Sequence, residues 1–315
     1  MSKKRPKPLR ARPSAGARSA VGSAAASRSV QTWLVAALAV VIVAAGTWAY
    51  ATSFDGVFVL DDIRAVARNP TIRSLWPPTT PLSPPTASTV AGRPIANVSL
   101  AISYALAPPD ARNTFEAGMP GAPPDAAERL RRNARGYHAG NLLIHLAAAL
   151  VLFGVVRRTL VSDRLRPAFD GTATWIAAAI ALVWVVHPLT TAAVTYVVQR
   201  VESLMSLFYL LTLYAVIRVS EGRRAGWWAA AAIAASALGM GTKETMVTAP
   251  ITAGVWLWMF GRRGGQRRAW MTLAGLAATW VILAALVYGE RRGSSVSLEA
   301  PTAWRYLLTQ SEIIV

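Results

Sequence analysis

Cysteine is absent from the 315 residues, which excludes both a disulfide framework and a thiolate metal site. Acidic residues are also scarce, with 15 against 33 lysines and arginines, so the formal net charge at pH 7 is +18. In a soluble protein this charge would suggest nucleic acid as a partner. The basic residues here cluster between long apolar runs, as the topology of membrane proteins requires. We therefore predict no nucleic-acid partner.

Apolar residues make up 54% of the chain, and several uninterrupted runs of them approach the roughly 20 residues needed to cross a bilayer. These runs of Val, Ile, Leu and Ala lack the alternation of a transmembrane β-barrel. The sequence therefore predicts an all-α polytopic membrane protein.

We divide the chain into five parts. Residues 1–32 contain many basic residues and no acid, and they are predicted to be a disordered cytoplasmic tail. Residues 33–51 form the first transmembrane helix, and 52–136 form a long extracytoplasmic loop. Six further transmembrane helices follow within 137–290, and 291–315 begin another extracytoplasmic segment. The six helices are expected near 137–156, 174–186, 204–219, 227–240, 246–260 and 269–288.

The charges of the loops predict which side of the membrane each loop faces. Loops rich in arginine alternate with loops that carry a single cation, Arg200 or Lys243. The arginine-rich loops and the basic tail should share the cytoplasmic side, which puts Asp61 and His187 outside. A cleaved signal peptide ending near Ala51 is an alternative to the first span, and it leaves Asp61 on the same side.

Two adjacent carboxylates, Asp61 and Asp62, follow the apolar residues Phe58, Val59 and Leu60 just after the first span. A carboxylate at the membrane surface can act as a general base towards a hydroxyl or can bind a divalent cation. An ordinary acidic loop, or a cap for the following turn, is the alternative. We predict that this pair is the catalytic centre.

Residues 92–106 are predicted to form an amphipathic helix that lies in the membrane interface. Pro94 suits a first helical position. Ile95, Val98 and Ile102 fall on one face at helical spacing, whereas Asn97 and Ser103 point elsewhere. The segment is too short to span a bilayer.

Three cations on the outer side, Arg93, Arg200 and Lys243, could hold a phosphate or pyrophosphate. The alternative for two of them is local pairing, Arg200 with Glu202 and Lys243 with Glu244. Both interpretations stay open at this point.

His138, Asn141 and His145 are separated by three and four residues, which places them on one helix face. A stripe of hydrogen-bonding groups is favoured over metal ligation, because seven residues separate the two histidines; metal binding remains undecided. These side chains complete a set predicted to line a polar cavity. The cavity-lining residues are Asn97, His138, Asn141, His145, His187, Tyr196, Glu202 and Glu244.

Five segments together resemble one known family. They are FVLDDIRAVARNP at 58–70, GRPIANVSLAISYAL at 92–106, GYHAGNLLIHLAAALVLF at 136–153, HPLTTAAVTYVVQRVESLMSLFYLL at 187–211 and GMGTKETMVTAPI at 239–251. In order and spacing they resemble the transmembrane-and-tetratricopeptide-repeat O-mannosyltransferases and their bacterial relatives. That family belongs to the GT-C glycosyltransferases, so the resemblance implies a GT-C-type helix bundle.

The resemblance also implies a chemistry. A sugar, mannose, is transferred with inversion from a polyprenyl-phosphate donor to an acceptor hydroxyl, that of Ser or Thr in an exported protein. Asp61 matches the position of the base, and Asp62 orients it or contacts the acceptor. The lipid-linked sugar is a co-substrate, and a divalent cation is allowed but not required. Composition suggests a bacterial source, so we expect an inner-membrane protein with its active site facing outward.

Alternatives to this function remain. Another sugar could be transferred to a glycan or lipid, or the chain could be a transporter or a non-enzymatic scaffold. The family pattern has more spans and C-terminal helical repeats, but no 34-residue repeat occurs here. We therefore expect that the segment at 291–315 is truncated.

Overall fold

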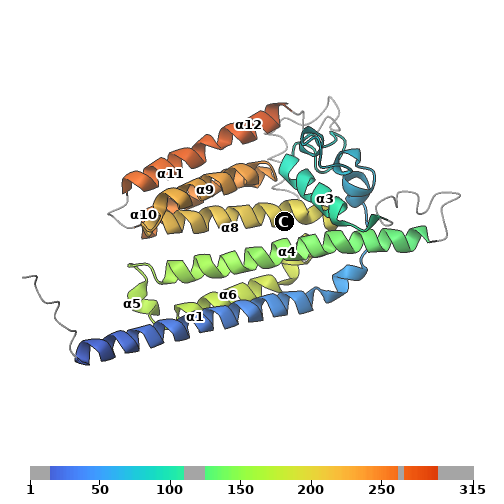
Figure 1. Cartoon of the computed structure of the whole chain (residues 1–315). Helices are drawn as coiled ribbons and strands as arrows, with labels where there is room; N and C mark the ends of the chain where they lie inside the picture. Colours follow the sequence, from blue (N-terminus) through green and yellow to red (C-terminus); the bar gives the residue numbers. More distant parts are fainter. Residues whose placement is uncertain (1–14, 110–124, 262–265, 290–315) are drawn as a thin grey trace, which may run out of the picture.

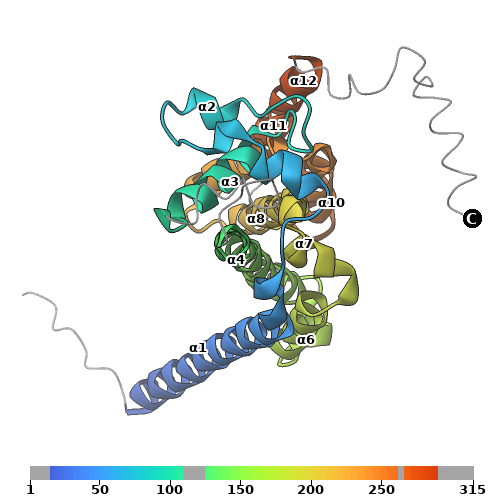
Figure 2. The ribbon, with the colours of Figure 1, turned by 90° about the vertical axis from the view of Figure 1, so that its right-hand side faces the viewer.

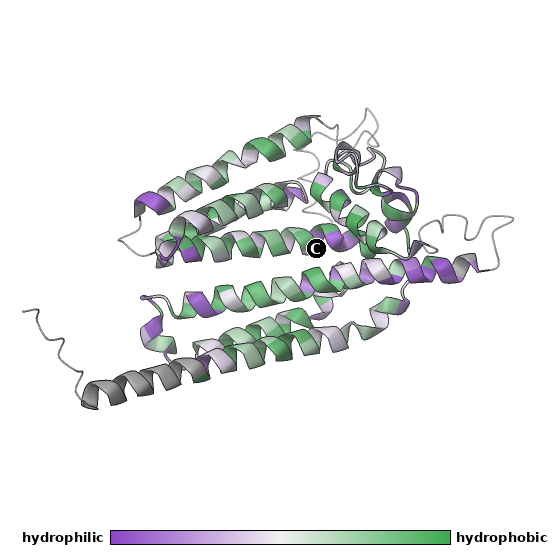
Figure 3. Ribbon diagram, in the orientation of Figure 1, coloured by the Kyte–Doolittle hydropathy of each residue, from purple (hydrophilic) through white to green (hydrophobic). Residues whose placement is uncertain are grey.

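The structure is a computed structural model that describes residues 15–109, 125–261 and 266–289. Those ranges contain helices and no strand. The long helices lie side by side as a bundle (Figure 1), and apolar residues cover much of their length (Figure 3). Four helices are long and apolar enough to cross a membrane, and one bent pair could form a fifth crossing. The predicted all-α polytopic membrane protein is confirmed.

One side of the bundle contains α1 (Ala15–Ala49), α4 (Ala126–Leu160) and α6 (Ala173–Val185), which contact one another. Its core includes Ile42, Phe153 and Ala181. Helix α1 begins 18 residues before Trp33, inside the segment for which we predicted disorder. Alanine, which is frequent there, has the highest helix propensity, and this favours extension of the helix beyond the apolar run.

Helix α4 has 35 residues and is therefore about 52 Å long, well over the hydrocarbon thickness of a bilayer. It starts at Ala126, and its polar first turns project past the bundle (Figure 3). Helix α6 is followed by η5 (Pro188–Thr190) and α7 (Thr191–Thr195), and the two halves of this span are bent by 54°. Pro188 breaks the helix as its missing N–H requires.

The other side of the bundle contains α8 (Arg200–Ser220), α9 (Ala225–Met240) and α10 (Ala249–Phe260), with α11 (Gln266–Ala278) and α12 (Trp280–Gly289) outside them. Seven spans were predicted for the whole chain, but α9 has 16 residues and α10 only 12. At 1.5 Å per residue they measure about 24 and 18 Å, less than the roughly 30 Å hydrocarbon core. Neither helix alone is therefore long enough to cross a bilayer, and the predicted number of seven spans stays a prediction.

The segment between α1 and α4, residues 50–125, was predicted to be extracytoplasmic and is called the outer loop below. Its described part folds over one end of the bundle (Figures 1 and 2). Its apolar core joins Phe58 and Val66 of the loop to Leu100 of α3, Tyr137 of α4 and Val198 of the segment before α8. This core fixes the Asp61 segment against three helices. The loop contains η1 (Ala51–Asp55), the π-turn η2 (Ile63–Ala67), η3 (Pro70–Ile72), α2 (Thr79–Leu82) and α3 (Pro94–Leu106).

Helix α3 matches the predicted amphipathic helix of the membrane interface. The side buried against the protein contains Asn97, Leu100 and Tyr104, whereas Ile102 and Leu106 are exposed. Polar Asn97 is buried because other residues of the loop satisfy its hydrogen bonds. The exposed apolar side chains leave the opposite face free to meet lipid, as an interfacial position requires.

Three short helices complete the described fold, α5 (Arg166–Phe169), η6 (Val197–Gln199) and η7 (Glu244–Thr248). Some predictions lie outside the described residues. They are the first 14 residues of the basic tail, residues 110–124 of the outer loop and the segment 291–315.

Candidate active site

The two aspartates lie in very different surroundings. The Asp62 side chain is fully buried, and its carboxylate accepts hydrogen bonds from the Val198 N–H at 2.8 Å and the Val59 N–H at 3.2 Å. Asp61 is exposed, and its backbone N–H donates to the Tyr196 hydroxyl at 3.0 Å. Asp62 therefore ties the loop to the segment before α8, while the carboxylate of Asp61 remains accessible.

The backbone before the pair is strained. Leu60 has a φ of 44°, in the left-handed region that side chains with a Cβ avoid, and its own side chain is 83% exposed. The π-turn η2 follows directly after Asp62. Both features are enriched at functional sites.

Burial raises the pKa of Asp62 to about 6, although its backbone hydrogen bonds act in the opposite direction. Burial also raises the pKa of the Tyr196 hydroxyl, which is already protonated at neutral pH at its ordinary pKa of 10. The hydrogen bonds of Asp62 and Tyr196 hold the loop in place, and the loop presents Asp61 to solvent.

Arg200 is 2% exposed, and its guanidinium is occupied by the protein. Its Nε donates to Asn141 Oδ1 at 2.6 Å and its Nη2 to the Tyr137 carbonyl at 2.6 Å. Its Nη1 donates to the Ser103 hydroxyl at 2.7 Å and the Ser99 carbonyl at 2.9 Å. The predicted phosphate contact would require these bonds to break. The geometry favours a structural role in which Arg200 joins α3, α4 and α8.

The polar stripe of α4 is buried, as the helical spacing predicted. The Asn141 amide donates to carbonyls of Val194, Tyr196 and Val197 at 3.2 to 3.3 Å. His145 Nε2 lies 2.9 Å from the Val185 carbonyl, and its ring stacks on Trp184. The His138 ring is buried against Gly56. Among the described residues, no group of three His, Asp or Glu side chains could hold a metal ion.

A network around Asn97 contains Asn69 and Thr71, two residues that were not among the predicted site residues. The Asn69 amide donates to Asn97 Oδ1 at 2.8 Å, and the Asn97 amide donates to the Thr71 hydroxyl and the Pro81 carbonyl, both at 2.8 Å. Asn69 precedes Pro70, and an Asn-Pro pair is a turn signal that could have identified it. Asn97 therefore anchors α3 rather than lining an open cavity.

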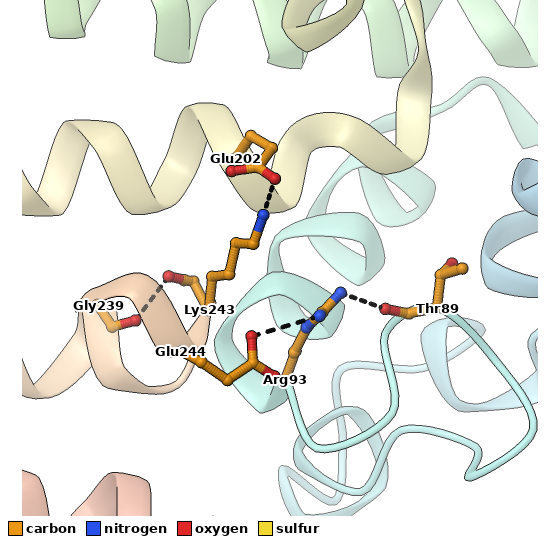
Figure 4. A network of polar contacts seen from close by, with 7 residues as sticks. Thr89, Arg93, Glu202, Gly239, Lys243 and Glu244 are labelled. Carbon is orange, nitrogen blue, oxygen red and sulfur yellow. Dashed lines mark hydrogen bonds and ion pairs between the residues drawn. The ribbon is translucent and has the colours of Figure 1, made fainter. Parts of the chain in front are cut away.

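The remaining cations form crossed ion pairs between segments far apart in sequence (Figure 4). Arg93, before α3, lies 3.4 Å from Glu244, and Lys243 pairs with Glu202 of α8. Burial, and then repulsion by Arg93, lowers the pKa of Lys243. The predicted local pairs, Arg200 with Glu202 and Lys243 with Glu244, are therefore replaced by long-range ones. Arg93, Lys243 and the two glutamates form a partly exposed cluster of both charges.

His187 does not join these groups. It is exposed, its Nδ1 accepts from the Leu189 N–H at 3.2 Å, and it lines an apolar surface groove of about 600 Å³ with Trp184 and Leu189. His187 therefore lies in an exposed turn after α6 and not with the other residues predicted to line the polar cavity.

The fold and this site together define a polytopic membrane protein with acids and cations gathered at one end of a helix bundle. Residues 139–288 match the profile of the dolichyl-phosphate-mannose-protein mannosyltransferase family. The predicted resemblance to lipid-dependent mannosyltransferases is confirmed. The matched range includes Arg200 and Glu202 and the adjacent residues Lys243 and Glu244, whereas Asp61 and Arg93 precede it.

Two curated relatives agree with this match. The chain is 28% identical over 188 residues to the protein O-mannosyl-transferase Tmtc2 of Drosophila melanogaster, covering 55% of this chain and 19% of the relative. It is 31% identical over 194 residues to the protein O-mannosyl-transferase TMTC1 of Mus musculus, covering 60% and 18%. The chain thus spans about a fifth of the length of these relatives. No solved structure matches.

Proposed function

We propose that the protein transfers mannose from a polyprenyl-phosphate donor to a Ser or Thr hydroxyl of an exported protein, on the outer side of a bacterial inner membrane. The family match and the named activity of the two relatives support this proposal. The main observation in its favour is that Asp61 is exposed and its neighbour Asp62 is buried, on a loop that is held to the bundle.

Asp61 is assigned as the general base. Its carboxylate removes the proton from the acceptor hydroxyl as the oxygen attacks the anomeric carbon of the sugar. The bond from that carbon to the donor phosphate breaks, and the lipid phosphate leaves with the electron pair. A single displacement of this kind inverts the anomeric configuration. Asp62 and Tyr196 act as positioning residues, because both bind the backbone of the loop.

Arg93 and Lys243 are assigned to the donor phosphate, whose negative charge grows as the bond to the sugar breaks. Cations aimed at this charge lower the barrier. Each cation now pairs with a partly exposed glutamate, so phosphate would bind by replacing Glu244 at Arg93 and Glu202 at Lys243. Arg200 is left out of this assignment because its donors already bind protein acceptors.

The first test compares Asp61→Asn with wild type in lipid nanodiscs that contain polyprenyl-phosphate mannose and a Ser/Thr-rich acceptor peptide. Release of lipid phosphate should fall by about 100-fold or more, because a general base contributes about 10² to 10⁴ in rate. Asp55→Asn is the matched control, since Asp55 is a nearby exposed acid whose 3.5 Å pair with Arg135 lies outside the proposed site. This control should retain activity.

Equal release by wild type and Asp61→Asn would refute the base assignment. Mass spectrometry of the acceptors separates the competing functions, because a mannosylated glycan or lipid in place of the peptide would overturn the proposed acceptor. Absence of release by the wild-type protein with every acceptor would favour a transporter or a scaffold.

A further inference from the structure

A groove of about 800 Å³ lies between α9 and α11, at the end of the bundle opposite the outer loop. Its mouth carries three exposed arginines, Arg224, Arg267 and Arg268. Its interior is lined by apolar and small side chains, among them Ala229, Ile233 and Met271. A cationic mouth above an apolar channel matches the chemistry of an amphipathic anion.

The charge at the mouth is not neutralised within the described part of the chain. None of the three arginines forms an ion pair there. Glu221, the nearest acid in the α8–α9 turn, is already paired with Arg158 at 2.5 Å and Arg218 at 3.3 Å. An external anion is therefore the complementary partner.

The depth of the groove fits one leaflet of a membrane. Arg224 and Ile233 are nine residues apart, which is about 14 Å along α9 and about half of the hydrocarbon thickness. At the deep end the helices meet, because Gly275 of α11 has no room for a Cβ beside Ile233. Trp227, 70% exposed, lines the mouth, and tryptophan is enriched at the level of lipid headgroups.

We propose that this groove binds an anionic phospholipid of the leaflet at that end, with the phosphate at the three arginines and an acyl chain against Ala229 and Ile233. Basic pockets between helices on the cytoplasmic side are suited to anionic headgroups. The site is separate from the donor site, because Lys243 lies beyond the other end of α9, which is about 24 Å long. The proposal does not depend on sugar transfer.

Native mass spectrometry of the full chain, delipidated in neutral detergent, tests this site. Dioleoyl phosphatidylglycerol should bind about tenfold more tightly than dioleoyl phosphatidylcholine, because each arginine near an anionic surface contributes favourably. Replacement of all three mouth arginines by glutamine should abolish this preference. The matched control replaces three arginines at the same end but outside the groove, Arg164, Arg166 and Arg223, and should keep it.

A second pair of variants leaves every charge in place. Ala229→Phe fills the groove, whereas Ala230→Phe adds the same ring to an exposed neighbour that does not line it. Only the first should weaken phosphatidylglycerol binding.

Equal binding of the two lipids by wild type would overturn the proposal, as would equal losses in the groove and control variants. Displacement of the lipid by an equal concentration of glycerol 3-phosphate would identify a site for a free phosphate instead. Circular dichroism and size-exclusion profiles establish that the variants are folded.

Discussion

At the residue scale, Asp61 and Asp62 are chemically identical neighbours with opposite surroundings. The Asp62 carboxylate binds two backbone N–H groups in the protein interior, and Asp61 is exposed. A base must reach its substrate, so exposure favours Asp61. The spacing of the pair alone could not make this distinction, because burial depends on Val198, which is 136 residues further along the chain.

The raised pKa of Asp62 predicts a pH dependence of stability. The folded protein favours the neutral carboxyl of Asp62 more than the unfolded chain does. The stabilisation of the folded state that results is complete below the ordinary pKa of 3.8 and is lost as the pH rises through about 6. Asp62→Asn cannot ionise. We therefore measure the unfolding temperature of wild type minus that of Asp62→Asn, and this difference should decrease by several degrees between pH 4 and pH 7.

Thermal unfolding in detergent across this pH range measures the effect. Asp55→Asn, which changes an exposed acid, should follow the wild-type profile. Parallel curves for wild type and Asp62→Asn would show that burial does not perturb the Asp62 carboxyl.

At the scale of single elements, α3 shows how much of the placement of a helix its sequence pattern predicts. Pro94 begins the helix as expected. Its apolar face was predicted to lie in the membrane interface, and Ile102 of that face is exposed, whereas Asn97 faces the protein. Periodicity identifies an amphipathic helix without saying whether protein or lipid covers its apolar side.

Substitution of Asn97 tests how α3 is held. Asn97→Leu removes the acceptor of one Asn69 amide N–H, whose other bond is to the Ala65 carbonyl, and the donor to the Pro81 carbonyl; each buried group left unsatisfied costs about 1–3 kcal/mol. We expect a clear drop in the unfolding temperature and faster proteolysis of the outer loop. Ser99→Ala on the same helix is the control, since the Ser99 hydroxyl donates to the Ala96 carbonyl of α3 itself. An unfolding temperature of Asn97→Leu that matches this control would contradict the anchoring role.

At the scale of the whole molecule, the arrangement of charge predicts orientation. The Asp61 loop caps one end of the bundle, and the arginines around Arg223 lie at the other end. From the positive-inside rule we predict that Arg223 lies in the cytoplasm and the loop outside.

The absence of cysteine makes this orientation directly measurable. Single substitutions Thr79→Cys in the loop and Arg223→Cys in the α8–α9 turn each introduce one thiol at an exposed position. A membrane-impermeant maleimide added to intact cells should label the first, and the second only after permeabilisation. The reverse pattern would invert the topology and place Asp61 in the cytoplasm.

The class of fold and several local features could be predicted from residues that are close together in the chain. Apolar runs, loop charge and proline positions depend on near neighbours in the chain, so the helices, the bend at Pro188 and the buried stripe at His138, Asn141 and His145 were predictable. The resemblance to mannosyltransferases also required only linear motifs.

The partners of the charged residues, in contrast, depend on contacts that form only when the chain folds. Lys243 pairs with Glu202 rather than with its neighbour Glu244, and Arg200 is bound by α3 and α4. Such contacts join residues about 40 to 100 positions apart, and no local pattern specifies them. The partition of the aspartates into a buried carboxylate and an exposed one has the same origin, because the helices on which the loop folds set the solvation of each group.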